Sequence, residues 1–110
     1  MSLTISDRSA GDFHVVELAG DIDIESAREL RAHIVERISD SSSRVVVDLT
    51  DVAFMDSSGL GALVGGWQMT REDGEFRIAG ASPVVQRVLS ITGMEQVFQL
   101  YPTVADATSS

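Results

Sequence analysis

The sequence predicts a single α/β domain spanning residues 1–110. Short runs rich in β-branched residues alternate with segments in which apolar residues recur at helical spacing, which is the pattern of strands joined by helices. A chain of 110 residues suits one domain and buries about two-thirds of the surface that it exposes when unfolded. No repeat, linker or low-complexity tract divides the sequence.

The composition excludes several classes of function. Seventeen acidic residues against eight basic ones give a formal net charge of −9, so nucleic acid and anionic lipid would both repel the chain. The absence of cysteine excludes disulfides and thiolate metal sites and fits a reducing compartment. No apolar run approaches the roughly 20 residues that cross a bilayer, and the N-terminus lacks signal-peptide features. We expect a cytoplasmic protein with no nucleic-acid partner and no membrane insertion.

The first part of the chain predicts a hairpin followed by a helix. Residues 3–7 and 13–18 are strand-like segments separated by a polar turn. Glycine and aspartate in residues 20–23 are typical of a tight change of direction. The helix is expected to begin between Asp23 and Ser26, because an S-x-x-E capping-box motif starts at Ser26.

A buried strand follows this helix. Apolar residues lie on one face of the helix through residues 27–38, and the polar residues 39–43 end it. Residues 44–49 are then an apolar run rich in valine, which predicts a strand. The order of strand, helix and strand favours a parallel pair joined by a right-handed crossover.

The second helix is predicted from Ser57 to about residue 71, although it contains an unusual number of glycines. Each glycine in a helix interior costs roughly 1 kcal/mol relative to alanine. Gly61 and Gly65 are four residues apart, so we expect them to let the helix lie close to a sheet or another helix. Close approach of a partner at the helix start is the alternative explanation, above all for Gly59.

The last third of the chain predicts one strand, one helix and a short final pair of elements. Residues 75–79 are the strand. Ser82 and Pro83 are the N-cap and first residue of the next helix, and Gly93 is its C-cap. Residues 96–100 are expected to add a strand or an extended edge, and residues 103–107 a last helical turn.

The segment Asp56-Ser57-Ser58 lies where a helix follows a buried strand. The first N–H groups of a helix lack partners within the helix, so this position favours anions. Phosphorylation of Ser57 would add about −1.5 to −2 charge beside Asp56, which a helix start tolerates but a packed partner would not. We therefore hypothesise that Ser57 is a phosphate acceptor in a switchable binding module. The alternative is that Asp56 or Ser57 serves only as an N-cap.

The residues offer little support for catalysis. A nucleophilic serine needs a base, but the sequence has only His14, in a predicted strand, and His33, on the first helix. The glycines after Ser57 do not have the spacing of a dinucleotide fingerprint. Four aspartates could meet at one end of the sheet and hold a divalent cation, but such residues are more often caps: Asp21, Asp23, Asp48 and Asp56. We expect no catalytic residue, no resident metal and no cofactor.

Three motifs carry a family resemblance that covers nearly the whole chain. The core is D-S-S-G-L-G from Asp56, preceded by V-V-D-L and F-M; the others are G-D-I-D from Gly20 and S-P-V-V-Q-R-V-L from Ser82. The sequence resembles the STAS domain of bacterial anti-sigma factor antagonists. This resemblance implies a mixed sheet of four to five strands with about four helices packed mainly on one face.

The resemblance also implies a mechanism of partner switching. The unphosphorylated antagonist binds an anti-sigma factor that is also an ATP-dependent serine kinase, and a sigma factor is thereby released. The kinase phosphorylates the position that matches Ser57, and a metal-dependent serine phosphatase restores it. The matching partner-binding positions are Asp23, Asp56, Ser58 and Gly59. ATP and Mg²⁺ belong to the kinase.

Two other roles remain open for a domain of this kind. One is a separate STAS subunit of a lipid or anion transporter, and the other is a stressosome-type scaffold. The short chain and the serine at position 57 argue against the scaffold. A weak homodimer is also left open, because the sequence does not determine the oligomeric state.

Overall fold

The structure is a computed structural model that describes residues 2–40 and 43–109. The described residues form one mixed five-stranded sheet in the order β1-β2-β3-β4-β5, in which β1 is antiparallel to β2 and the remaining pairs are parallel. The strands are β1 (Leu3–Ala10), β2 (Phe13–Ile22), β3 (Arg44–Met55), β4 (Glu75–Ala79) and β5 (Gln99–Tyr101). The hairpin and the parallel pairing of the second and third strands are confirmed.

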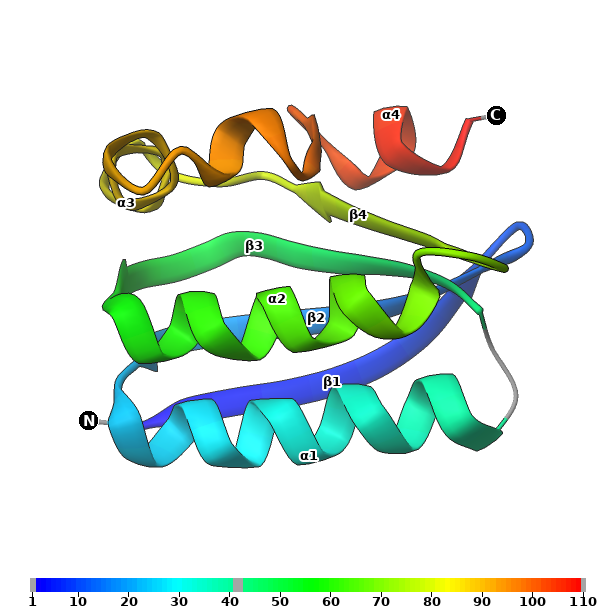
Figure 1. The fold of residues 1–110 in the computed structure, drawn as a ribbon, viewed down its shortest axis with the longest axis horizontal. Coiled ribbons are helices and arrows are strands. Elements are labelled where there is room, and N and C mark those ends of the chain that lie inside the picture. Colours follow the sequence, from blue (N-terminus) through cyan, green and yellow to red (C-terminus); the bar gives the residue numbers. More distant parts are fainter. Residues whose placement is uncertain (1, 41–42, 110) are drawn as a thin grey trace.

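Four α-helices within the described part of the chain accompany the sheet: α1 (Ile24–Asp40), α2 (Ser57–Thr70), α3 (Pro83–Ile91) and α4 (Val104–Thr108). Helices α1 and α2 run side by side and begin at the same end of the molecule, opposite the β1–β2 turn (Figure 1). Buried residues of α1, α2 and α3 share the main core cluster, whereas Ala107 of α4 packs on a second cluster with Phe13, Val15, Val46 and Ala79. The expected α/β domain, a mixed sheet of four to five strands with about four helices, is confirmed.

Strands β1, β2 and β3 extend further than the sequence indicated, and β1 reaches Ala10 rather than residue 7. Residues 20–23 were expected to turn and the strand from residue 44 was expected to end at residue 49. Instead, β2 continues to Ile22 and β3 to Met55, and these two residues are paired. The register shifts twice in this region. Gly20 has a φ of 113°, and a Cβ at this position would strike the Ser2 carbonyl oxygen. Such bulges break the alternation of buried and exposed residues, so the strand ends did not show the two-residue period.

Helix α1 begins at Ile24, within the expected interval, but its cap differs from the prediction. The Ser26 N–H donates to Asp23 Oδ1 at 3.0 Å, and the Asp23 N–H donates to Ser26 Oγ at 2.8 Å. Asp23 is therefore the N-cap, and Ser26 is the third helical residue that closes a reciprocal capping box. The S-x-x-E motif that begins at Ser26 lies inside the helix.

The glycines that permit close packing of α2 are not the expected pair. A Cβ on Gly59 would lie 2.5 Å from Met55 Cγ, and one on Gly66 would lie 2.6 Å from Phe76 Cε1. A Cβ on Gly61 would meet none of the described residues within 4 Å, and one on Gly65 would meet only the Arg31 side chain, at 3.7 Å. The prediction for Gly61 and Gly65 was wrong, because the buried face of α2 is the one that carries Gly59 and Gly66.

The remaining elements agree closely with expectation. Ser82 caps α3 by accepting the Val85 N–H, and Pro83 is the first helical residue. Thr92 is the C-cap of α3, and Gly93 follows it with a left-handed φ of 75°. A short 3₁₀ turn, Met94–Gln96, ends where a strand or an extended edge was expected to begin, and the strand that follows, β5, is only three residues long.

Candidate functional site

Two helix N-termini lie side by side at one edge of the sheet. Strands β2 and β3 are parallel and end together, since Ile22 pairs with Met55 and the Asp56 N–H donates to the Ile22 carbonyl at 3.2 Å. The next residue after each strand is an aspartate that caps a helix, Asp23 for α1 and Asp56 for α2. The carboxyl edge of the sheet therefore presents two capped helix starts as one surface.

Asp56 organises the first turn of α2. Its Oδ1 accepts the Ser58 N–H at 2.9 Å, the Gly59 N–H at 3.4 Å and the Ser58 hydroxyl. The hydrogen bond from the Ser58 hydroxyl is the main reason why the pKa of Asp56 lies below its usual value; the two N–H groups act in the same direction, while burial and the nearby Asp23 oppose them. Asp56 is thus a charged cap at neutral pH.

The two serines of this turn have different environments. Ser57 is the first residue of α2 and its side chain is exposed. Among the described residues, no group forms a hydrogen bond with the Ser57 hydroxyl, whereas the half-buried Ser58 donates its hydroxyl to Asp56. Ser57 is therefore the serine whose oxygen an incoming protein can reach, and Asp56 is the N-cap.

Asp23 is held rigidly beside this turn. Its Oδ1 accepts the N–H groups of Ser26 at 3.0 Å and Glu25 at 3.2 Å, together with the Ser26 hydroxyl at 3.0 Å. The hydrogen bond from the Ser26 backbone is the largest cause that lowers the pKa of Asp23. Within the described part of the chain, neither Asp23 nor Asp56 forms an ion pair with a basic side chain, so N–H and hydroxyl groups are the donors that hold both carboxylates.

Two exposed apolar residues lie close in the sequence to the two aspartates. Ile24 follows Asp23 and is 64% exposed, and Phe54 lies two residues before Asp56 and is 40% exposed. Their side chains are available to a partner that docks at the start of α1 and α2. We use the name switch surface for Asp23, Ile24, Phe54, Asp56 and Ser57.

Gly59, Asp48 and Asp21 do not add side chains to the site around Ser57. Gly59 is buried against Ile22 and Met55, and this close packing explains why the residue is glycine.

Asp48 lies within β3 beside Glu17 and Ala79. It is eight residues before Asp56, which places it about 20 Å or more away along the strand. Asp21 meets the start of α1 through its carbonyl, which accepts the Ser26 hydroxyl at 3.1 Å. The residues that the structure describes contain no cluster of three or more ligands arranged for a metal ion.

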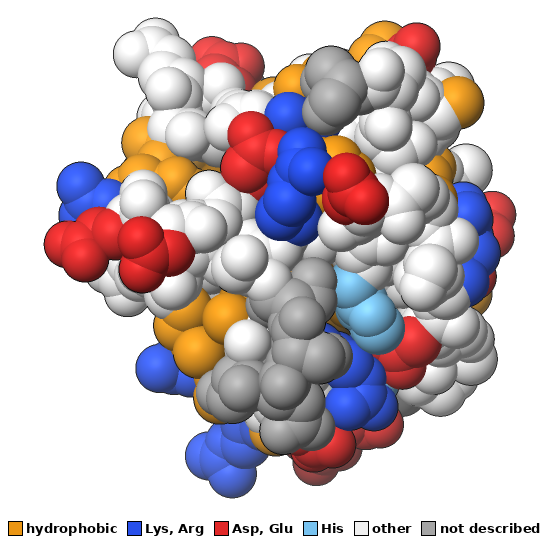
Figure 2. All heavy atoms as spheres, turned by 90° about the vertical axis from the view of Figure 1, so that its right-hand side faces the viewer, with side chains coloured by type: hydrophobic (Ala, Val, Ile, Leu, Met, Phe, Trp, Pro, Cys, Tyr) orange, Lys and Arg blue, Asp and Glu red, His pale blue; other side chains and the backbone are white. Residues whose placement is uncertain are grey.

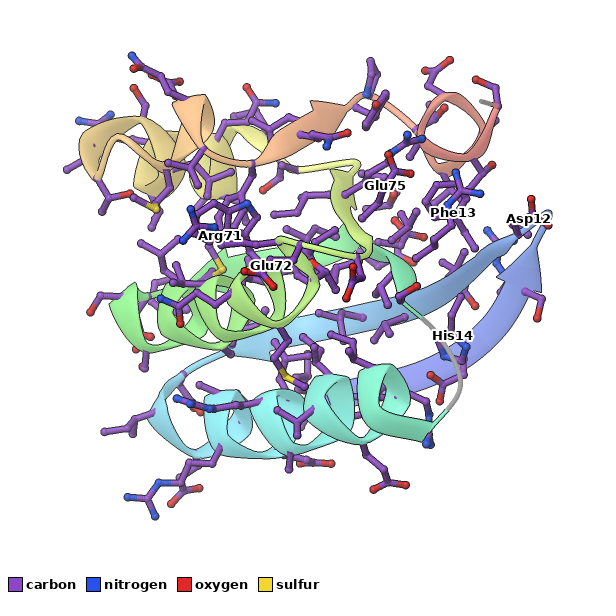
Figure 3. All side chains as sticks on the ribbon, turned by 45° about the vertical axis from the view of Figure 1, so that its right-hand side comes forward. Asp12, Phe13, His14, Arg71, Glu72 and Glu75 are labelled. Carbon is purple, nitrogen blue, oxygen red and sulfur yellow. The ribbon has the colours of Figure 1, made fainter. Side chains whose placement is uncertain are left out.

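The two histidines lie at the opposite end of the molecule. His14 Nε2 and His33 Nε2 are 2.6 and 2.8 Å from Asp7 Oδ1, and Arg37 Nε is 3.4 Å from the same oxygen. His14 lies near the β1–β2 turn with Phe13 and Asp12 (Figure 3). Figure 2 shows this end of the molecule, where basic, acidic and histidine side chains are mixed. Neither imidazole is placed to act as a base for Ser57.

The fold and the switch surface define a class of small α/β domains that present a hydroxyl at a capped helix start. A family model described as STAS domain matches residues 4–107, so this chain belongs to the STAS domain family. No helix in the described part of the chain is long and apolar enough to cross a membrane.

Relatives and solved structures agree with this assignment. An anti-sigma-B factor antagonist of Staphylococcus aureus strain NCTC 8325 is 30% identical over 101 residues, which cover 91% of this chain and 94% of the relative. The crystal structure of an anti-sigma factor antagonist from Mycobacterium paratuberculosis is 30% identical with a TM-score of 0.91, and the match covers 98% of this chain and 92% of that one. The Bacillus protein SpoIIAA in its phosphorylated form shares the fold, with a TM-score of 0.73 at 21% identity over 96% of each chain.

Proposed function

We propose that this protein is an anti-sigma factor antagonist whose binding to an anti-sigma factor is switched off by phosphorylation of Ser57. The observation that carries the proposal is the exposed Ser57 at the start of α2, whose hydroxyl forms no hydrogen bond with the residues that the structure describes. The names of the Staphylococcus and Mycobacterium relatives support the general role. In this role the chain is the substrate of a kinase and has no catalytic residue of its own.

The geometry explains how the fold would tolerate a phosphate. A phosphoryl group on Ser57 would lie at the positive end of α2, where a helix start attracts a negative charge by roughly 0.3–1 kcal/mol. The start of α1 lies next to it, so a second helix adds a favourable field. Asp56 and Asp23 oppose this attraction with two negative charges. The attraction by the helix starts and the repulsion by the two carboxylates are both small and have opposite signs, so the phosphorylated domain should remain folded.

The same phosphate would exclude a partner from the switch surface. A partner that packs on Ile24 and Phe54 removes water from Ser57 as well, and a buried, uncompensated dianion is far more unfavourable than a buried hydroxyl. The partner should carry a cationic group that meets Asp23 and Asp56. Ser58 and Gly59 act indirectly in this proposal, since they position Asp56 and the first turn of α2.

Two enzymes complete the proposed cycle. The anti-sigma factor would itself be a serine kinase that brings ATP and Mg²⁺, and a metal-dependent serine phosphatase would remove the phosphate. The phosphatase must reach Ser57 in the free antagonist, and the exposed position at the start of α2 allows this. All components would meet in the cytoplasm.

Incubation with the anti-sigma factor kinase of the same organism and Mg-ATP tests the proposal. We expect mass spectrometry to find one phosphate on Ser57 in the wild type and in the matched variant Ser58→Ala, and none in Ser57→Ala. Binding of the anti-sigma factor should persist in Ser57→Ala and be lost in Ser57→Asp. The free energy of unfolding of both variants should stay within about 1 kcal/mol of that of the wild type. Unmodified Ser57 together with unaltered binding by Ser57→Asp would favour a transporter subunit instead.

A further inference from the structure

Gly61 lies one helical turn after Ser57 on the same face of α2. Residues four apart on a helix are neighbours on its surface, and both Gly61 and Ser57 are exposed. A side chain at position 61 would therefore project beside the Ser57 hydroxyl. The nature of residue 61 decides how closely another molecule can approach that hydroxyl along the helix.

Nothing within the described part of the chain requires glycine at position 61. Gly59 and Gly66 are explained by side chains that a Cβ would strike, but a Cβ on Gly61 would meet none of the described residues within 4 Å. Its backbone is helical, and it is not among the glycines with positive φ. Glycine in a helix interior is unfavourable compared with alanine, so the fold gains no stability from this choice.

Gly65, one turn further on, provides a natural comparison. It is half-buried, and a Cβ there would lie 3.7 Å from Arg31 Nε and 3.8 Å from Arg31 Cζ. The Arg31 guanidinium of α1 therefore already lies beside Gly65. The open space on this side of α2 is found at Gly61, next to Ser57.

We infer that Gly61 is a specificity-determining position that lets the main chain of the anti-sigma factor kinase approach the Ser57 hydroxyl. This inference rests on the proposed function and adds a steric requirement to it. Without a Cβ, the helix surface at position 61 can be met by a backbone segment of the partner at van der Waals distance. A methyl group would move that segment away from α2, and transfer of a phosphoryl group depends on close placement of the two reactants.

The test uses Gly61→Ala, with Gly65→Ala as the matched control. In the free protein, both variants should unfold at a temperature equal to or above that of the wild type, because alanine is the better helix former. With the kinase and Mg-ATP, we expect the rate of Ser57 phosphorylation to fall at least tenfold in Gly61→Ala and to stay within twofold of wild type in Gly65→Ala. Kinase affinity in the absence of ATP should fall in parallel.

Three outcomes would overturn the inference. A Gly61→Ala protein that is phosphorylated and bound like the wild type has no steric requirement at this position. A Gly61→Ala protein that unfolds at a lower temperature than the wild type would show that the glycine serves the fold. An equal loss of phosphorylation rate in Gly61→Ala and Gly65→Ala would show a general effect of stiffening α2. A wild-type protein that is neither bound nor phosphorylated would instead overturn the proposed function, and the inference with it.

Discussion

At the scale of single residues, Asp56 distinguishes two adjacent serines. It draws the Ser58 hydroxyl and two backbone N–H groups to one carboxylate oxygen, and the Ser57 side chain is left outside this set of bonds. The pattern D-S-S alone does not predict which hydroxyl is free, because a serine after the cap can hydrogen-bond either to the cap or to solvent. The cap geometry thus supplies the reason to choose Ser57.

The cap of α2 can be tested through Asp56→Ala. We expect this variant to lose about 1 kcal/mol of unfolding free energy at pH 7, because Ser58 and Gly59 lose the acceptor of their N–H groups. The folded-state pKa of Asp56 is lowered, so its contribution is complete above the unfolded pKa, near 3.9, and is lost as the pH falls through the folded value.

Urea unfolding of wild type and Asp56→Ala between pH 7 and pH 2.5 measures this contribution. The difference between the two proteins should be constant above about pH 5 and narrow below about pH 4. Asp56→Asn is the control, since its amide oxygen can still accept the two N–H groups without titrating. A difference that does not change with pH would show that the charge of Asp56 has no part in the stability of the cap.

At the scale of elements, the sequence predicted most helices and strands but not where β1, β2 and β3 end. The Ser82-Pro83 start of α3 and the strand Glu75–Ala79 follow simple local rules and were predicted correctly. The ends of β2 and β3 depend on bulges, which leave no regular period in the sequence. The switch surface itself depends on those ends, because the pairing of Ile22 with Met55 brings Asp23 next to Asp56.

The glycines of α2 show the same limit. Local spacing could identify glycines that share a face, but not which face would be buried. The structure places Gly66 against the Phe76 ring and the Ile34 side chain, and leaves Gly61 open. Which glycine is required for packing is decided by the neighbouring elements, so it became visible only in three dimensions.

Gly66→Ala tests the packing of α2 on β4 and α1. A Cβ would lie 2.6 Å from Phe76 Cε1 and 2.8 Å from Ile34 Cγ2, so buried side chains must move. We expect a loss of about 1–3 kcal/mol of unfolding free energy, which outweighs the gain in helix propensity. Chemical unfolding measures it, with Gly65→Ala as a control on the same helix. A Gly66→Ala protein as stable as Gly65→Ala would mean that α2 does not pack as described.

At the scale of the whole molecule, a group of ion pairs lies near the β1–β2 turn, at the end opposite the switch surface. Near the β1–β2 turn, Arg44 and Arg77 both pair with Glu75 at 3.0 Å, and Asp7 pairs with Arg37 and two histidines. The switch surface has two carboxylates without a cationic partner among the described residues. These two carboxylates and the net charge of −9 both favour a cationic partner over an anionic one at this surface.

This distribution of charge predicts how the association rate depends on salt. If a cationic partner docks on the switch surface, the association rate constant should fall as ionic strength rises from about 0.05 to 0.5 M, because the Debye length shortens from roughly 14 to 4 Å. Asp23→Asn should lower the association rate constant at low salt and weaken its dependence on salt.

Asp12→Asn is the matched control. It removes the same charge near the β1–β2 turn, where Asp12 pairs with Arg44 at 3.4 Å. Stopped-flow or surface-based kinetics with the anti-sigma factor measure both effects. Equal salt dependence in the wild type and the two variants would mean that the unpaired carboxylates do not guide the partner, and that recognition rests on Ile24 and Phe54.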